Sequence, residues 1–146
     1  MPSVTRRPDI TPEYLNKRAK GSLIGWMGVI IQTVEDGQLT ADMVITPNHM
    51  APNGFLHAAS VVALADSSCG NATIAHLPDG AENFTTVELK SNHLGTARDG
   101  TLHCIATPQH LGRTTQVWDA TVIHVETKKT IALFRCTQMI LWPRSL

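Results

Sequence analysis

The residues best suited to do chemistry lie in one segment, Asn53 to Gly70, which reads NGFLHAASVVALADSSCG. Within the longer apolar run from Leu56 to Leu77, Asp66 is the only ionisable acid. A carboxylate in a buried helix costs several kcal/mol unless it is paired or its pKa rises. Chains keep such a group mainly where it acts as an acid, a base or a nucleophile. Asp66 is therefore the first candidate catalytic residue, and a structural acid bonded to a neighbouring turn is the alternative.

The start of the same segment offers a second kind of group. Asn53-Gly54 is a turn signal, and His57 follows it where the helix is expected to begin. The first N–H groups of a helix have no partner within the helix, so those of Ala58 and Ala59 are available to a negatively charged atom. His57 has two interpretations, a catalytic side chain or a cap that only orients the loop. Asn53-Gly54 is equally consistent with a plain turn.

His57 and Asp66 are nine residues apart, which places them on opposite sides of a helix and about 13 Å apart along its axis. One chain therefore does not easily bring both to one site. A two-fold dimer does, because an isologous interface sets the helix start of one chain against the helix middle of the other. The spacing predicts a homodimer, or a tetramer built from two dimers, with sites shared between chains.

The elements that must position these residues follow from periodicity and turn signals. A short helix with a Thr-Pro start is expected over 11–20, and Asp36-Gly37 joins two strands into a hairpin. Short connections predict that the later strands are antiparallel neighbours in chain order. The pattern is α+β, with a curved antiparallel sheet around one central helix. Strands are expected over 23–34, 39–45, 83–94, 101–109, 114–125 and 130–142, and the long helix over 56–77.

Composition sets the class of protein. A length of 146 residues predicts one domain, 1–146, with 1–20 as an N-terminal helical extension. The formal net charge is zero, which argues against a nucleic-acid partner, and no apolar run is long enough to span a membrane. The first residues lack the apolar run of a signal peptide, and three cysteines without CxxC spacing are expected to be buried reduced thiols. These features predict a cytoplasmic protein, and the scattered histidines predict no metal site.

The stretch HMAPNGFLHAASVVALADSSCG, from His49 to Gly70, resembles the signature of hotdog-fold acyl-CoA thioesterases related to the phenylacetate-degradation thioesterase, the PaaI-like family. That branch typically shows an Asn, a Pro/Gly turn, His-Gly-Gly, and an Asp or Glu nine residues after the His. His57 and Asp66 keep this spacing. The segments FTTVELKSNHLG and GRTTQVWDATV resemble the later strands of the family, so the resemblance covers residues 20 to 142.

Three positions depart from the family pattern. The His-Gly-Gly motif reads His57-Ala58-Ala59 here, and alanine keeps the backbone N–H that a donor role needs. The Asn or Gln that often stands six residues before the His is replaced by Ala51, and nearby Asn53 is the candidate to replace it. Some relatives carry Ser or Thr four residues after the acid, where this chain has Gly70, so Ser67-Ser68 is the alternative source of a hydroxyl.

The resemblance implies a hotdog fold and hydrolysis of an acyl-CoA thioester to a free acid and CoA at a site between subunits. The N–H of Ala58 would then stabilise the oxyanion, and Asp66 would either attack the carbonyl or activate water. Both routes stay open. No cofactor is expected, because coenzyme A is part of the substrate. A non-catalytic acyl-CoA-binding protein and a hotdog hydratase or dehydratase are the alternatives.

The remaining candidates concern substrate binding. Phosphate groups favour Arg and Lys, and Arg113 beside Thr114 is the preferred CoA phosphate site by resemblance. Lys90, Arg98 and Arg144 are further candidates, although each is also consistent with a plain surface charge, and Lys90 with a solvated pair formed with Glu88. Substrate contacts are also expected at Gly54 and Gly70, where small residues leave room for the pantetheine arm or a partner helix.

Overall fold

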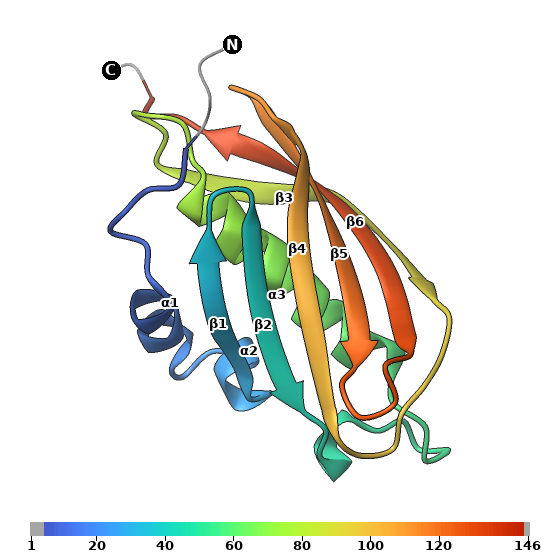
Figure 1. Cartoon of the computed structure of the whole chain (residues 1–146). Coiled ribbons are helices and arrows are strands. Elements are labelled where there is room, and N and C mark those ends of the chain that lie inside the picture. The colour runs from blue at the N-terminus through green and yellow to red at the C-terminus, as the bar shows by residue number, and fades with distance from the viewer. Residues whose placement is uncertain (1–4, 145–146) are drawn as a thin grey trace.

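The computed structural model describes residues 5–144, which form a six-stranded antiparallel sheet curved around one long helix (Figure 1). This is the α+β hotdog architecture that the resemblance implies. In chain order the elements are α1 (Pro12–Ala19), α2 (Leu23–Trp26), β1 (Val29–Glu35), β2 (Gln38–Val44), the 3-10 turn η1 (Pro47–His49), α3 (Ala58–Ala75), β3 (Asn83–His93), β4 (Thr101–Leu111), β5 (Thr115–His124) and β6 (Thr130–Leu141). The hairpin β1–β2 turns at Asp36-Gly37, as predicted.

The strand predicted over 23–34 is wrong at its start, where the chain forms the short helix α2 instead. The Ser22 side chain caps this helix by accepting a hydrogen bond from the N–H of Gly25. Gly28 then adopts a φ of +76°, a conformation that suits glycine and reverses the chain before β1. The apolar residues of 23–26 suggested a strand, but a cap at one end and a glycine at the other enclose a single helical turn.

The later strands are antiparallel neighbours as predicted for β4–β5 and β5–β6, but the predicted pairing of β3 with β4 is wrong. The sheet order is β1-β2-β4-β5-β6-β3, so β3 pairs with β6 at one edge while β4 pairs with β2 in the interior. Three strand spacings separate β3 from β4, about 14 Å. The seven-residue connection over 94–100 has a reach of about 23 Å when extended, so a short connection does not force its two strands to be neighbours.

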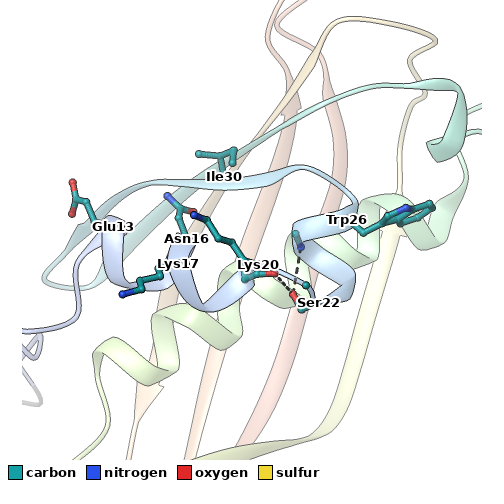
Figure 2. A pocket seen from close by; sticks show the side chains of 10 residues that line it. Glu13, Asn16, Lys17, Lys20, Ser22, Trp26 and Ile30 are labelled. Carbon is teal, nitrogen blue, oxygen red and sulfur yellow. Dashed lines mark hydrogen bonds between the residues drawn. The ribbon is translucent and has the colours of Figure 1, made fainter.

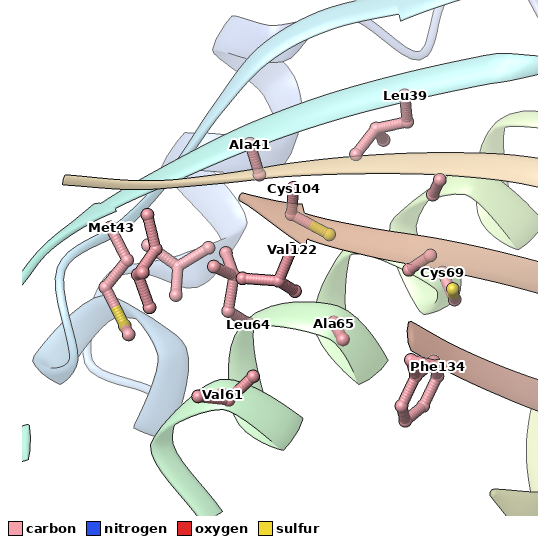
Figure 3. Close-up of a cluster of buried hydrophobic side chains, with 14 of the residues drawn as sticks. Leu39, Ala41, Met43, Val61, Leu64, Ala65, Cys69, Cys104, Val122 and Phe134 are labelled. Carbon is pink, nitrogen blue, oxygen red and sulfur yellow. The ribbon is translucent and has the colours of Figure 1, made fainter. Parts of the chain in front are cut away.

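The core lies between the concave face of the sheet and α3. Leu64, Ala65 and Cys69 of the helix are fully buried against side chains of β2, β4, β5 and β6 (Figure 3). Alternate residues of β4 and β5 point into this core. All three cysteines are buried free thiols, as predicted. Within residues 5–144, every helix is too short or too polar to cross a membrane.

Two neighbouring surfaces remain incompletely covered in the protomer. β3 is an edge strand, and nearly all of its residues are exposed, including the apolar side chains of Val87 and Leu89. The adjoining side of α3 carries a stripe of half-buried residues at helical spacing, namely Val62, Ala63, Asp66, Ser67, Asn71 and Ile74. The helix is therefore closed by the sheet on one side and left open on the other, and Asp66 lies on the open side.

Candidate active site

The loop before α3 is shaped by local hydrogen bonds. The Asn53 side chain accepts a hydrogen bond from the N–H of Phe55 at 3.2 Å, and Gly54 has a φ of +81°. A bridge between Met50 and Leu56 closes the loop at its base. Asn53-Gly54 therefore forms a turn, as the sequence predicts. The amide nitrogen of Asn53 is not used by this turn, so its predicted contact with substrate stays a prediction.

The first N–H groups of α3 can be counted one by one. The N–H of His57 donates to the carbonyl of His49, and the N–H of Ser60 donates to the carbonyl of His57. The N–H of Ala59 donates to Nδ1 of the His57 ring at 2.9 Å, so His57 is the helix cap. Within residues 5–144, the N–H of Ala58 has no acceptor, and this residue is exposed.

The capping bond also fixes the protonation of the neutral His57 ring. Because Nδ1 accepts a hydrogen bond, the hydrogen of the neutral imidazole lies on Nε2. The ring therefore presents an N–H donor beside the free N–H of Ala58. The two interpretations of His57 are compatible, since one nitrogen caps the helix while the other remains available.

Asp66 lies in the middle of α3 on the open side of the helix. One carboxylate oxygen, Oδ1, is buried and finds no hydrogen-bond partner among residues 5–144. Burial raises the pKa of Asp66 above that of an ordinary aspartate. Structural carboxylates are normally hydrogen-bonded. Asp66 therefore does not fit the alternative interpretation, a structural acid bonded to a neighbouring turn. A buried unpaired oxygen is instead suited to accept a proton or to attack an electrophile.

Of the two serines that follow Asp66, Ser68 does not supply the hydroxyl that relatives carry, whereas Ser67 lies on the open side of α3 and stays a candidate. The Ser68 side chain donates to the carbonyl of Leu64, within the helix and on its buried side. Gly70 is also buried, and a Cβ there would lie 3.0 Å from the ring of Phe84. In the protomer Gly70 therefore allows β3 to pack against the helix, and a contact with substrate stays a prediction.

Ala58 and Asp66 are not brought together within one protomer. They are eight residues apart in a regular helix, about 12 Å along its axis. The two groups therefore meet only if a second protomer supplies one of them.

The predicted phosphate-binding residues fall into separate places. Lys90 lies opposite Arg135 of β6, on the convex face of the sheet, and within residues 5–144 no ion pair joins it to Glu88. Arg98 stacks on the Phe55 ring at 4.9 Å, beside the loop that leads into α3. Arg113 lies at the far end of α3, where its guanidinium stacks on Trp142 at 4.5 Å.

Arg113 and Thr114 line a cleft of about 720 Å³ beyond the C-terminal end of α3. Its other walls come from the N-terminal segment, from the chain after α3 and from the end of β4, namely Thr5 to Pro8, Leu77 to Asp79, His110 to Gly112 and Trp142. Three arginines border this cleft, so it is suited to an anionic group.

A second hollow, of about 800 Å³, lies between α1, α2 and the edge of β1 (Figure 2). The side chain of Asn16 covers part of this edge by bonding both the N–H and the carbonyl of Ile31. Trp26 stands at the rim and is 68% exposed. None of the residues predicted for the site from the sequence lines this hollow.

The sequence analysis missed His49, which the structure places beneath the start of α3. It is 2% exposed, and its backbone carbonyl holds the N–H of His57. Only its position in the motif from His49 to Gly70 could have indicated a role. Polar residues before a turn are usually exposed, so the burial of His49 was not expected.

Comparison with known proteins agrees with this geometry. Residues 53–131 match the Thioesterase superfamily. The 1,4-dihydroxy-2-naphthoyl-CoA hydrolase of Escherichia coli is 31% identical over 109 residues, which cover 75% of this chain and 79% of the relative. A crystal structure of a mutant of thioesterase PA1618 from Pseudomonas aeruginosa superposes with a TM-score of 0.88, at 30% identity, over 95% of this chain and 99% of that chain.

The fold is also that of the E. coli PaaI protein from the phenylacetic acid degradation operon, with a TM-score of 0.76 at 21% identity over 88% of this chain and 92% of that chain. The match to the superfamily includes the turn at Asn53-Gly54, the whole of α3 and its free N-terminal N–H, and the unpaired acid. This chain therefore belongs to the thioesterase superfamily, as a hotdog protein of the PaaI-like kind.

Proposed function

We propose that the chain hydrolyses an acyl-CoA thioester to a carboxylic acid and free CoA, at a site shared by two protomers. The observation that carries the proposal is the buried, unpaired Oδ1 of Asp66 on the open side of α3. A CoA thioester is the natural substrate class, because the E. coli relative is a hydrolase of a naphthoyl-CoA. Water is the second reactant, and no cofactor is needed.

The open stripe of α3 supports a two-fold arrangement. If two α3 helices cross antiparallel with the axis near Val62, residue 58 of one faces residue 66 of the other, because Val62 lies midway between them. Val62 and Ala63 are half-buried and apolar, and the exposed edge of β3 lies beside them. An exposed apolar edge strand is commonly covered in the assembled protein. A dimer, or a tetramer of two such dimers, is therefore proposed.

In this arrangement the free N–H of Ala58 and Nε2–H of His57 face the thioester oxygen, where negative charge develops during attack. Asp66 of the other protomer either removes a proton from water or attacks the carbonyl carbon itself. The carbon–sulfur bond then breaks, and the CoA thiolate takes up a proton. In the route by direct attack the acyl group is left on Asp66 as a mixed anhydride, which water hydrolyses to release the acid and restore the carboxylate. The raised pKa of Asp66 makes its carboxylate a stronger base than an ordinary aspartate.

The arginine cleft is proposed to hold the CoA phosphates. Leu77, on its wall, lies eleven residues after Asp66, about 17 Å along the direction of α3. It lies nineteen residues, about 28 Å, from Ala58 of the same chain. The cleft is thus nearer to the Asp66 of its own protomer, at a distance that an extended pantetheine arm can span. Arg113 and Thr114 are the residues we assign to this contact.

Replacing Asp66 tests the proposal. Asp66→Asn keeps the shape of the side chain but has neither a base nor a nucleophile, so release of free CoA from a panel of acyl-CoAs should fall more than about tenfold, which is about 1.4 kcal/mol. The variant should be at least as stable as the wild type, because burial disfavours the charged carboxylate and a neutral amide avoids that cost. A variant that keeps more than about a tenth of the rate rejects the role of Asp66.

The same assay addresses the non-catalytic alternative, which Ala51 keeps open because it offers no side-chain amide. A chain that binds acyl-CoA but releases no free CoA would be a binding protein. If hydrolysis is observed, single turnover in heavy-oxygen water distinguishes the two routes. Heavy oxygen in Asp66 requires direct attack followed by hydrolysis of the anhydride at the Asp66 carbonyl, whereas activation of water puts the label in the product acid alone.

A further inference from the structure

We propose that His49 is a positioning residue, which sets the start of α3 and thereby the N–H of Ala58. The inference rests on the proposed function, since that function gives Ala58 its role. His49 is 2% exposed in the protomer, and its ring and its carbonyl are both fully engaged. It therefore acts on the site through other residues rather than by touching substrate.

The His49 ring joins two separate segments. The N–H of Thr46 donates to Nδ1 at 3.1 Å, so in the neutral ring the hydrogen lies on Nε2. Nε2 then donates to the carbonyl of Met27 at 2.9 Å, at the end of α2. The first bond is local, across three residues, whereas the second spans 22 residues and fixes the loop against α2.

The His49 carbonyl holds the helix start. It accepts the N–H of His57 at 3.0 Å and the hydroxyl of Ser60 at 2.8 Å. His57 is the cap of α3, and Ser60 lies in its first turn. One oxygen atom therefore fixes the residues on both sides of Ala58. A shift of about 1 Å in such a donor can cost a hundredfold in rate.

Serine variants test the carbonyl contact with a matched control. Ser60→Ala removes one of the two donors to His49, whereas Ser68→Ala removes another buried hydroxyl, which donates to the carbonyl of Leu64 and has no contact with His49. Ser60→Ala should lower kcat about tenfold with KM changed less than about twofold, because the donor acts on transition-state charge. Ser68→Ala should keep kcat, even if both variants lose similar stability.

Two variants of His49 separate the bonds of the ring. In His49→Gln the amide nitrogen can take the place of Nε2 and keep the bond to Met27, whereas in His49→Asn the amide oxygen can take the place of Nδ1 and keep only the bond to Thr46. We expect Gln to retain most of the kcat and Asn to lose about tenfold or more. Equal kcat values for Asn, Gln and wild type would overturn the assignment.

Amide hydrogen exchange gives a readout that does not depend on activity. The His57 amide should exchange faster in Ser60→Ala than in Ser68→Ala, because only the first variant loosens its acceptor. If the wild type hydrolyses no acyl-CoA while this difference is present, the proposed function fails and the positioning contact stands. If Asp66→Asn abolishes hydrolysis but Ser60→Ala changes neither kcat nor exchange, the inference about His49 is wrong.

Discussion

The two ends of α3 each carry a histidine, and the two are used in opposite ways. His57 at the N-terminal end is exposed, caps one N–H and leaves the N–H of Ala58 without an acceptor. His76 at the C-terminal end is 0% exposed, and both ring nitrogens are bonded, one to the carbonyl of Ala72 and the other to the N–H of Gly37. His57 thus leaves a free N–H donor at its end of the helix, whereas the His76 ring leaves no free hydrogen-bonding group, and the cleft beyond that end is lined by other residues.

Further bonds close the C-terminal end. The Gln116 side chain donates to the carbonyl of His76, and the Trp118 side chain donates to Gln116. Arg7 donates to the carbonyls of Leu77, Pro78 and Ala81, which follow the helix. Buried polar groups that are fully bonded stabilise a fold and offer no free chemistry. Free hydrogen-bonding capacity, rather than residue type, therefore distinguishes the histidine beside the candidate oxyanion donor from the histidine that is structural.

The largest expected effect is on stability, at the C-terminal end. His76→Ala removes a buried ring that packs on Trp118 at 5.2 Å and leaves the N–H of Gly37 without its acceptor. Unfolding in denaturant should show that the free energy of unfolding of this variant is lower by about 3 kcal/mol. The rate per folded molecule should change little, because this end lies far from Ala58. A large fall in kcat without loss of stability would contradict the contrast between the two ends.

The next effect is on rate, at the N-terminal end. Ala58→Pro removes the free N–H and little else, since His57 already has an extended backbone that tolerates a following proline. Hydrolysis should fall about a hundredfold, about 2.7 kcal/mol, with a smaller change in substrate binding. Ala58→Gly keeps the N–H and serves as the control, with a rate close to the wild type. A folded Ala58→Pro variant with normal activity would place the oxyanion elsewhere, at a side chain such as Asn53 or His57.

The smallest expected effect is a loss of stability at acidic pH. Burial lowers the pKa of His76 below that of a free histidine, so the unfolded chain binds a proton that the folded chain does not. Stability is then complete above the unfolded pKa, about 6.5, and falls as pH drops below it, by at most about 1.4 kcal/mol per pH unit. Denaturation at several pH values should show this fall in the wild type and a weaker one in His76→Gln. If the free energy of unfolding falls with pH equally in the wild type and in His76→Gln, protonation of His76 does not cause the loss of stability in acid.

The sequence predicted the local features and missed the long-range ones. Periodicity and turn chemistry predicted the helix α3 and the hairpin turn. A single acid in an apolar run led to the choice of Asp66, and the expected helix start led to that of Ala58. Each of these signals lies within a few residues of sequence. The position of β3 at the sheet edge was mispredicted because strand pairing depends on contacts distant in sequence. His49 was missed for the same reason, since its partner Met27 lies 22 residues away.

The two ends of α3 also explain why the candidate site could only be predicted in part. Arg113 was predicted as a CoA phosphate contact by resemblance, and nothing in the sequence indicated that it lies at the end of the helix opposite Ala58. Single residues can be chosen by their chemistry, but which of them share a site depends on how two chains meet. The exposed β3 edge and the unpaired oxygen of Asp66 lie on the surface where we propose that a second chain binds.

Mixing two inactive variants tests the shared site most directly. Co-expressed Asp66→Asn and Ala58→Pro chains form mixed dimers in which one site combines the intact Ala58 of the first chain with the intact Asp66 of the second, while the other site carries both defects. With random pairing, half of the dimers are mixed and half of their sites are intact, so we expect recovery of about a quarter of wild-type hydrolysis. Mixed dimers that form, as shown by two different affinity tags, yet remain as inactive as the parents would contradict it.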